Sequence, residues 1–384
     1  MDTVSSKVLT EFSSRFQTKP NLYYSPGRIN LIGEHVDYND GFVMPAAIDK
    51  GIWYALASND SDQLNFYSID FTEAISINLH EVKKMDSWKN YVLSVVNEFV
   101  VRGLPVKGFD CVFGGNIADG AGMSSSAAVE GGLAFGINQI FNCGIANKEL
   151  ALLCQKAEHN YPGVNCGIMD QFANMMGKKD HVILLDTMTL KYEYFPLILK
   201  GFAIVLINTK VHHSLAASAY NKRREECNDG LTILKAHNEI NSFRDVDREI
   251  LDASKNEMSG TIYNRCLFII EEIARTKRAS VMLQQNDLVQ FGKLMYEAHD
   301  GLSNLYEVSC PELDFLVEHA RTDLNVLGSR MMGGGFGGCT INIIKTDDVD
   351  SFIQSATVAY EEKFNIEAEV FHVGICDGTH QVMI

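Results

Sequence analysis

Residues 26–41 decide how the rest of the chain is interpreted, and they read Pro26-Gly27-Arg28-Ile29-Asn30-Leu31-Ile32-Gly33-Glu34-His35-Val36-Asp37-Tyr38-Asn39-Asp40-Gly41. One arginine, three carboxylates and one histidine stand here between apolar runs. The closing Asn39-Asp40-Gly41 is a hairpin signal, because Asp-Gly supplies the positive φ angles of a tight turn. We therefore expect a turn at this point and a returning strand in Phe42-Val43-Met44.

Turn geometry explains Asp40, but it leaves Glu34, His35 and Asp37 unexplained. These residues crowd carboxylates around an imidazole, which costs electrostatic energy unless a polar group is bound there. A hydroxyl-rich ligand would satisfy them, with Arg28 nearby. The alternative is a solvated acidic loop, and this stretch alone favours neither interpretation.

The chain of 384 residues is too long for one ordinary core and predicts about two or three domains. Short β-branched runs alternate with segments of helical period, which indicates a mixed α/β or α+β architecture. Strands are expected within residues 182–185, 202–207 and 340–344. A polar stretch with Pro196 separates two strand-like runs, so we place the junction there and divide the chain into lobes 1–195 and 196–384.

Charge and cysteine content exclude several classes of partner. The formal net charge of −16 repels nucleic acid and anionic lipid over most of the surface. The apolar runs are far shorter than the ~20 residues that a membrane span needs. Nine cysteines without a C-x-x-C pair, behind an N-terminus interrupted by charges, predict reduced thiols and a cytoplasmic protein.

The second chemical signal is Gly120-Ala121-Gly122-Met123-Ser124-Ser125-Ser126-Ala127-Ala128-Val129-Glu130. Apolar positions with helical spacing follow it, so a helix is expected to begin among the serines. Glycines allow close approach of the backbone to a ligand, and a helix N-terminus attracts phosphate. Serine capping is the alternative, but the stretch holds more small and hydroxyl residues than a cap needs. It is neither a Walker A loop nor a G-x-S-x-G elbow.

Two carboxylates are expected at neighbouring helix ends. A helical stripe is broken by Pro162-Gly163, which places Glu158 near the end of one helix. A short helix is then expected from Asp170 to Gly177. Taken singly, Asp170 would be explained as a helix N-cap and Glu158 as surface charge.

A glycine-rich stretch occupies residues 333–338 and matches G-x-G-x-x-G. That fingerprint of dinucleotide binding must follow a strand and open a helix. Here the glycines precede the strand-like residues 339–343, so we reject the Rossmann interpretation. A tight backbone passage is the remaining expectation.

Taken together, these stretches resemble the galactokinase family of the GHMP small-molecule kinases. Residues 26–46 resemble the galactokinase signature, 120–128 the phosphate-binding motif, 166–171 the catalytic segment and 330–339 the third, glycine-rich motif. The resemblance implies a two-lobed α+β GHMP kinase fold with the active site in the cleft between the lobes. It also implies an enzyme that transfers the γ-phosphoryl group of ATP to the anomeric hydroxyl of D-galactose, giving galactose 1-phosphate and ADP.

The resemblance assigns roles to individual residues. Asp170 is the catalytic aspartate, which accepts the proton of the anomeric hydroxyl, and Arg28 stands beside it. A nearby guanidinium keeps a carboxylate ionised and offsets the charge that develops on the transferring phosphoryl group. Magnesium bridges the phosphates, with Ser126 and Glu158 as its protein ligands.

Further contacts follow from the same resemblance. The sugar contacts are Glu34, His35, Asp37, Gly167 and Tyr220. The phosphate-binding residues are Gly120, Ala121, Gly122, Met123, Ser124, Ser125 and Ser126. Trp88 and Tyr91 resemble the aromatic side of an adenine pocket, although they could equally be core aromatics.

Two other functions compete with this expectation. The nearest is a related sugar-1-kinase that acts on N-acetylgalactosamine or arabinose, since selectivity depends on pocket shape. The other is a non-catalytic sensor of sugar and ATP, which the intact serine loop, Glu158 and Asp170 argue against. We expect galactose and ATP as the small-molecule partners, and a monomer.

Overall fold

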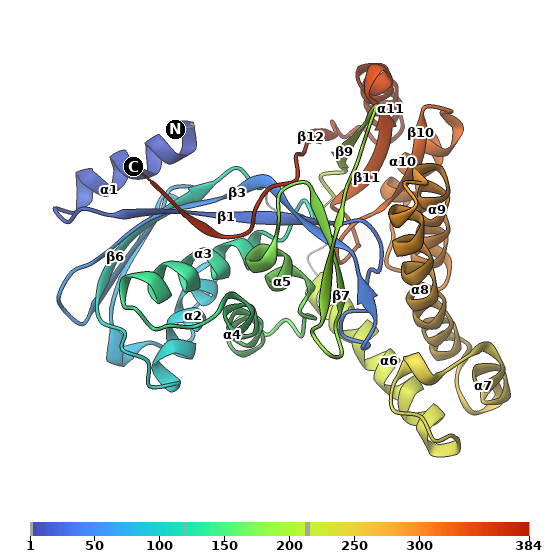
Figure 1. Cartoon of the computed structure of the whole chain (residues 1–384), viewed down its shortest axis with the longest axis horizontal. Coiled ribbons are helices and arrows are strands. Elements are labelled where there is room, and N and C mark those ends of the chain that lie inside the picture. The colour runs from blue at the N-terminus through green and yellow to red at the C-terminus, as the bar shows by residue number, and fades with distance from the viewer. Residues whose placement is uncertain (1–2, 119, 212–215, 384) are drawn as a thin grey trace.

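Helices and strands are mixed along the chain, in agreement with the expected α+β fold class. The computed structural model describes residues 3–118, 120–211 and 216–383. In Figure 1 these residues gather around a six-stranded sheet on the left and a four-stranded sheet on the right. A smaller three-stranded sheet stands between them.

The six-stranded sheet has the strand order β13-β1-β3-β6-β4-β5, and only the β4–β6 pair among these described strands is parallel. Its strands are β1 (Asn21–Asn30), β3 (Pro45–Ser58), β4 (Gln63–Ser68), β5 (Glu73–Asn78), β6 (Phe109–Gly115) and β13 (His380–Val382). β1 and β3 pair along almost their whole length, with a register shift between Pro26 and Arg28. A proline within a sheet is tolerated at such an irregularity because it cannot donate to the ladder.

Helices cover both faces of this sheet (Figure 1). Adjacent residues of a strand point to opposite faces, and β3 illustrates this. Ala55 packs with Val8 and Phe12 of α1, whereas the hydroxyl of Tyr54 donates to the carbonyl of Val129 in α3 at 2.7 Å. The five helices are α1 (Thr3–Arg15), α2 (Lys89–Val101), α3 (Ser125–Ile140), α4 (Asn147–Asn160) and α5 (Met169–Met176).

The four-stranded sheet is antiparallel, in the order β10-β11-β9-β12. Its strands are β9 (Phe202–Asn208), β10 (Val326–Met331), β11 (Cys339–Lys345) and β12 (Glu369–His372). Ile204 and Leu206 of β9 join the core formed with α8 and α9, while Val205 and Ile207 join the core formed with α10 and α11. Because both faces are covered, the strand is continuously apolar rather than alternating.

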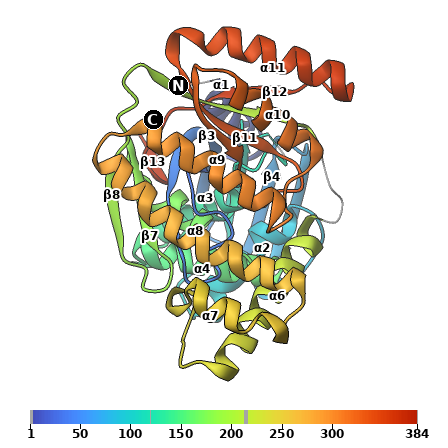
Figure 2. The ribbon, with the colours of Figure 1, turned by 90° about the vertical axis from the view of Figure 1, so that its right-hand side faces the viewer.

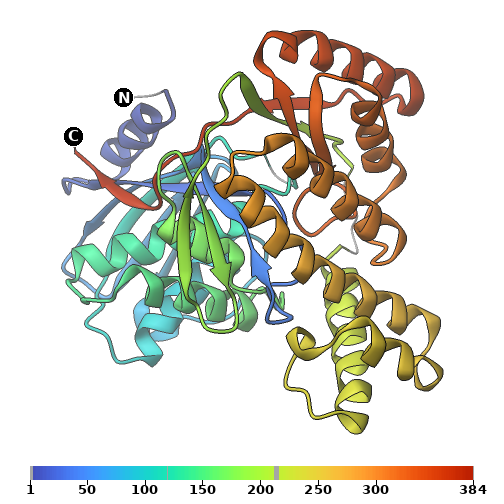
Figure 3. The same cartoon turned by 45° about the vertical axis from the view of Figure 1, so that its right-hand side comes forward.

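The helices of this half are α6 (Ala216–His237), α7 (Arg248–Ala253), α8 (Gly260–Gln284), α9 (Leu288–Asn304), α10 (Pro311–Thr322) and α11 (Val349–Phe364). Figure 2 shows α8 and α9 side by side across the front. The small sheet consists of β2 (Phe42–Val43), β7 (His181–Asp186) and β8 (Tyr192–Pro196) (Figure 3). Short 3-10 helices occupy Leu79–Glu81, Phe243–Asp245, Lys255–Glu257 and Thr346–Asp348.

Most local predictions agree with these elements. The expected strands fall within β7, β9 and β11, the serine-rich stretch opens α3, and α5 with its C-cap Gly177 is the expected short helix. The glycine-rich stretch connects β10 to β11, as expected for a passage before a strand.

The turn at Asn39-Asp40-Gly41 forms, but its details differ from the expectation. Asp40 has φ of 57°, whereas Gly41 is confined because a Cβ there would lie 2.5 Å from Val36. Met44 returns beside the chain, with its N–H donating to the Ile32 carbonyl at 3.1 Å. Phe42 and Val43, however, pair with β7. Most of the expected returning strand therefore pairs with β7 and not with the chain that precedes the turn.

Gly27 lets the signature approach the serine loop. A Cβ at Gly27 would lie 2.6 Å from the carbonyl oxygen of Met123, and the N–H of Arg28 donates to that oxygen at 3.1 Å. A side chain at this position would separate the two segments. Backbone contact between them places Arg28 at the mouth of the loop.

The two ends of the chain lie close together on the left of Figure 1. Strand β13 returns to the first sheet and pairs with β1, with Leu22 opposite Val382. The division of the chain at residue 195 stays a prediction. Among the described residues, no helix combines the length and apolar character that a membrane crossing requires.

Candidate active site

Arg28 and Asp170 form the centre of the candidate site. Arg28, at the end of β1, donates from Nε to Oδ1 of Asp170 at 2.7 Å and from Nη2 to Oδ2 at 2.9 Å. Asp170 lies in the first turn of α5 and is not its N-cap, which is Ile168. The Arg28 side chain is 5% exposed and that of Asp170 is 27% exposed. The guanidinium is therefore buried, whereas the carboxylate that it binds remains partly accessible to solvent.

The charge of Asp170 also acts on Arg28. Burial alone would lower the pKa of the Arg28 guanidinium, but Asp170, Glu34 and Asp37 together raise it above its usual value. Arg28 consequently stays protonated. A permanent cation therefore lies beside the carboxylate of Asp170.

The serine loop lies against this pair. Arg28 donates from Nη1 to the carbonyl of Gly122 at 2.5 Å, and the Ser124 hydroxyl donates to Oδ2 of Asp170 at 2.5 Å. Ser124 precedes α3 with a left-handed φ of 60° and makes no side-chain capping bond. Its hydroxyl serves Asp170, so capping does not explain this serine. The N-terminus of α3 beside the pair is a suitable place for an anion.

A cavity of about 120 Å³ opens beside the Arg28–Asp170 pair. It brings together residues from the signature, the catalytic segment, α4, α6 and the glycine-rich loop. Its lining residues are Arg28, Glu34, His35, Asp37, Glu158, Val164, Cys166, Gly167, Met169, Asp170, Tyr220, Gly333 and Gly334. All predicted sugar contacts and the predicted catalytic pair therefore line one cavity.

Glu34 is fixed by a buried ion pair that joins the two halves of the chain. Its Oε1 accepts from Nη1 and Nη2 of Arg330, both at 3.2 Å, and from the N–H of Gly333 at 2.8 Å. Arg330, at the end of β10, is fully buried and also donates from Nε to the Leu31 carbonyl at 2.9 Å. This pairing holds the signature against the third motif.

Asp37 lies against the catalytic segment. The N–H of Met169 donates to its Oδ2 at 3.4 Å, and a Cβ at Gly167 would lie 1.9 Å from the same oxygen. Gly167 thus leaves the space that the carboxylate occupies. Burial, and then the charge of Asp170, raise the pKa of Asp37 to about 7.

His35 is a neutral imidazole in this setting. Burial lowers its pKa to about 3, and the nearby Arg223 and Arg330 add to this effect. Its ring lies 5.4 Å from that of Tyr220, between ring centroids. Both side chains present a flat apolar surface with polar atoms at the rim, which suits a sugar ring.

Glu158 is buried on the last turn of α4, so it is not a surface charge. Its Oε2 accepts from Nε2 of Gln171 at 2.6 Å and from Sγ of Cys166 at 3.5 Å. Burial, and then Asp170, raise the pKa of Glu158 to about 7, while the Ser126 hydroxyl hydrogen-bonds to it and acts in the opposite direction. Ser126 and Glu158 thus place two oxygen atoms side by side that could both coordinate a cation.

These two oxygens fit a hard cation that keeps most of its own water. Magnesium is typically held by one or two carboxylates with water and phosphate oxygens, not by an all-protein cage. Within the described ranges, no group of three or more histidine, cysteine or acidic residues is placed so that it could hold a metal ion. A buried carboxylate such as Glu158 would also gain from a positive partner.

Trp88 and Tyr91 do not line the cavity. Trp88 is buried at the start of α2, where its Nε1 donates to Oε2 of Glu73 at 3.2 Å and its ring stacks on Phe71 with a centroid distance of 6.1 Å. It belongs to the core of the six-stranded sheet. A role for either residue in binding adenine stays a prediction.

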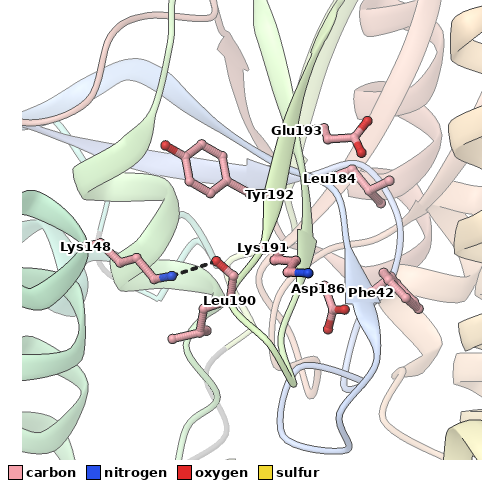
Figure 4. Close-up of a pocket in the computed structure, with 8 residues that line it drawn as sticks. All are labelled: Phe42, Lys148, Leu184, Asp186, Leu190, Lys191, Tyr192 and Glu193. Carbon is pink, nitrogen blue, oxygen red and sulfur yellow. Dashed lines mark hydrogen bonds between the residues drawn. The ribbon is translucent and has the colours of Figure 1, made fainter.

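A larger and more open cavity of about 620 Å³ lies along the β7–β8 hairpin (Figure 4). Lys148 there donates to the carbonyl of Leu190 at 2.9 Å, and Asp186 is paired with Arg244. Among its described lining residues, Phe42 alone lies within one of the sequence motifs, near the end of the signature, and none is a predicted site residue. Size alone therefore does not identify the chemical site in this protein.

Sequence reasoning missed Arg330 and Gln171 as site residues. In the sequence, Arg330 is only the first residue of the third motif, although a charged residue at the end of an apolar strand is itself a signal of a buried partner. Gln171 directly follows Asp170 in the sequence and donates a hydrogen bond to Glu158. No local pattern pointed to it.

Comparisons with known proteins identify the family of this chain. Residues 10–58 match the galactokinase galactose-binding signature, residues 90–178 the GHMP kinases N terminal domain and residues 279–360 the GHMP kinases C terminal. A galactokinase of Bacillus subtilis is 42% identical over 379 residues, covering 97% of each chain. One of Clostridium acetobutylicum is 42% identical over 94% of this chain and 95% of its own.

Solved structures give the same result. Lactococcus lactis galactokinase complexed with galactose superposes with a TM-score of 0.95 at 35% identity, covering 98% of this chain and 99% of its own. The mevalonate kinase of Methanococcus jannaschii, at 18% identity, has a TM-score of 0.66 and covers 94% of this chain and 100% of its own. The second likeness is one of fold.

Proposed function

This chain belongs to the galactokinase family of the GHMP kinases, and we propose that it transfers the γ-phosphoryl group of ATP to the anomeric hydroxyl of D-galactose. The products are galactose 1-phosphate and ADP. The observation that carries the proposal is the Arg28–Asp170 pair, which stands at the junction of the signature cavity and the serine loop. A sugar hydroxyl and a phosphate would meet there.

Asp170 accepts the proton of the attacking hydroxyl in this proposal. Its carboxylate lines the cavity and is the more exposed member of its pair. Arg28 and Ser124 fix both of its oxygens. A carboxylate held this way is oriented before substrate arrives, which reduces the entropy cost of reaching the reactive geometry.

Arg28 and the serine loop compensate the negative charge of the bound phosphates. The guanidinium lies between Asp170 and the carbonyl of Gly122, where it can offset charge developing on the transferring phosphoryl group. We assign phosphate binding to residues 120–126 and the N-terminus of α3, since backbone N–H groups at a helix start favour anions. Positioning and charge compensation supply most of the catalysis of phosphoryl transfer.

Five further residues that line the cavity are the proposed sugar contacts. We assign this role to Glu34, His35, Asp37, Gly167 and Tyr220. Glu34 and Asp37 offer acceptors to ring hydroxyls, and Gly167 keeps Asp37 close to the catalytic segment. Selection among galactose-like sugars would follow from which hydroxyls reach these fixed acceptors.

Ser126 and Glu158 are assigned as the protein ligands of magnesium, which supplies charge neutralisation at the bound phosphates. Their adjacency and the burial of Glu158 support this assignment. We assign adenine binding to Trp88 and Tyr91 on the resemblance alone. All nine cysteines, each in the described part of the chain, are free thiols, which supports a cytoplasmic location. We also propose a monomer.

The test is release of ADP by the purified protein with Mg-ATP and D-galactose, beside parallel reactions with glucose, N-acetylgalactosamine and arabinose. Asp170→Asn removes the carboxylate charge while keeping its shape. Asp347→Asn, at an exposed aspartate of the 3-10 helix Thr346–Asp348, is the matched control. We expect turnover with galactose that Asp170→Asn loses and Asp347→Asn retains.

Each other outcome has a defined meaning. Turnover confined to another sugar would keep the mechanism and replace the substrate. Binding of galactose and ATP without turnover would identify a sensor and overturn the proposal. Full activity of Asp170→Asn would remove Asp170 from the mechanism.

A further inference from the structure

A chain of hydrogen bonds runs from the cavity into the core behind it. Nδ1 of His35 lies 2.7 Å from the hydroxyl of Tyr38, which lies 2.9 Å from the hydroxyl of Tyr306. The Tyr306 hydroxyl lies 3.1 Å from Sγ of Cys227. We call these four residues the histidine relay.

The relay is held rigidly by its surroundings. Tyr306 and Cys227 are fully buried, and the ring of Tyr306 lies 4.7 Å from that of Phe268 between centroids. The backbone carbonyl of Tyr306 accepts from Nε of Arg223 at 2.8 Å. Tyr306 follows α9 and Cys227 lies on α6, so the second half of the chain supports a residue of the signature.

His35 has one nitrogen in the relay and one at the cavity. The side chain is 4% exposed and lines the cavity, and its Nε2 has no hydrogen bond partner within the part of the chain that the structure describes. A buried nitrogen without a partner costs free energy. A ligand atom in the cavity would supply the missing partner.

The protons along the relay can be ordered in two ways. If Tyr38 donates to Nδ1, the proton of the neutral imidazole is on Nε2. If Nδ1 donates to Tyr38, Nε2 carries a lone pair instead. The position of one proton therefore decides whether His35 offers the ligand a donor or an acceptor.

The hydrogen bond between Tyr38 and Tyr306 favours the first order. Burial raises the pKa of Tyr38, and the hydrogen bond with Tyr306 opposes this rise, which is the effect of a bond donated to the Tyr38 oxygen. The proton of Tyr38 is then free for Nδ1 of His35, at 2.7 Å, so the ring proton is on Nε2. Burial keeps the ring neutral, with a pKa of about 3, so only one nitrogen is protonated.

We propose that Tyr38, anchored by Tyr306, is a positioning residue that holds the proton of His35 on Nε2 and makes this histidine a hydrogen bond donor to a sugar oxygen. The inference rests on the proposed function for the identity of the sugar. Glu34 and Asp37 provide acceptors in the cavity, and His35 adds a donor. The sugar is then recognised through both the protons and the lone pairs of its hydroxyls.

The first test is the tautomer of His35 in the ligand-free, full-length protein. Nitrogen NMR of ¹⁵N-histidine-labelled protein at neutral pH distinguishes protonated from unprotonated ring nitrogens, and loss of signals in His35→Gln identifies the residue. We expect Nε2 protonated and Nδ1 unprotonated. An Nδ1-protonated ring in the wild-type protein would overturn the proposal.

Two variants then test the relay itself. Tyr38→Phe removes the donor to Nδ1, and we expect a mixture of tautomers with KM for galactose raised about 10-fold and kcat within about 3-fold. Tyr306→Phe leaves Tyr38 able to donate, so the proton should stay on Nε2 and KM should rise less. Tyr360→Phe is the matched control, since its buried hydroxyl bonds only the Thr209 carbonyl, at 2.9 Å, among its described contacts.

An unchanged tautomer and an unchanged KM in Tyr38→Phe would overturn the proposal, as would an equal rise of KM in Tyr360→Phe. The spectra need no substrate and no turnover. If the wild-type protein does not phosphorylate galactose, the proposed function fails in the kinetic assay while the spectra still decide the tautomer. The two failures are therefore separable.

Discussion

Arg28 binds Asp170 in a bidentate manner: two nitrogens of its planar guanidinium donate to the two carboxylate oxygens at 2.7 and 2.9 Å. The third nitrogen is bound to the carbonyl of Gly122 in the serine loop. One side chain thus ties the aspartate to the loop assigned to phosphate. Both the charge and the planar shape of the guanidinium contribute to this interaction, and substitution of Arg28 can separate the two contributions.

Arg28→Lys keeps the positive charge and removes the planar set of N–H donors of the guanidinium. Lysine is a point charge that cannot bind two carboxylate oxygens and a carbonyl in one plane. We expect kcat for galactose phosphorylation to fall about 100-fold with a smaller change in KM. Arg15→Lys, at an exposed arginine paired with Glu11, should leave both constants unchanged. Near-normal kcat in Arg28→Lys would show that charge alone is sufficient.

Ser124→Ala tests whether this serine serves Asp170 or the helix. The hydroxyl bonds Asp170 and makes no cap to α3, so we expect kcat to fall about 10-fold with the melting temperature nearly unchanged. Ser259→Ala is the converse control, because Ser259 caps α8 by accepting from the N–H of Ile262. That variant should lose about 1 kcal/mol of stability and keep its kcat. The reverse pattern would reassign Ser124 to capping.

The behaviour of Ser124 shows what the sequence could and could not predict. Helix starts and strands follow from local periodicity, and these predictions agree with α3, α5 and β9. The order of the motifs comes from the resemblance. The use of the Ser124 hydroxyl depends on Asp170, which lies 46 residues away in the sequence. A local pattern cannot distinguish a capping serine from one that faces a distant carboxylate.

Long-range pairs explain the other omissions. Glu34 was assigned to the sugar, but its partner Arg330 lies 296 residues away. Tyr306 lies outside every motif, in a segment whose composition gives no sign of contact with the signature. The contact between Arg28 and Asp170 was predicted only from the resemblance, because the residues taken singly would explain Asp170 as a helix N-cap.

Asp37→Asn should change how stability depends on pH. Native Asp37 keeps its proton up to about pH 7, whereas the unfolded chain loses it near about pH 4. The native state binds more protons in this window, so the contribution of Asp37 to stability falls as pH rises. Asparagine has no such penalty. We expect the variant to gain stability relative to wild type between about pH 4 and 7, reaching roughly 2–4 kcal/mol above it.

Urea unfolding of ligand-free protein across this range measures the difference, with Asp347→Asn as the exposed control. A difference that does not vary with pH would contradict the raised pKa of Asp37. The same variant should bind galactose more weakly, because an amide replaces one carboxylate acceptor by a donor. Calorimetric titration with galactose checks that second effect.

Arg330→Met should be the most destabilising of these changes. It leaves the carboxylate of Glu34 buried without its charged partner, and such a loss costs about 3–5 kcal/mol. Adding Glu34→Gln removes the stranded charge, so we expect the double variant to be more stable than Arg330→Met alone, although it binds galactose poorly. Arg278→Met, at an exposed arginine paired with Glu297, should cost less than about 1 kcal/mol. Urea unfolding of wild type, Arg330→Met, Glu34→Gln and the double variant at one pH gives the coupling energy between the two residues. Strictly additive losses would show that Arg330 stabilises the fold through its backbone carbonyl partners rather than through Glu34.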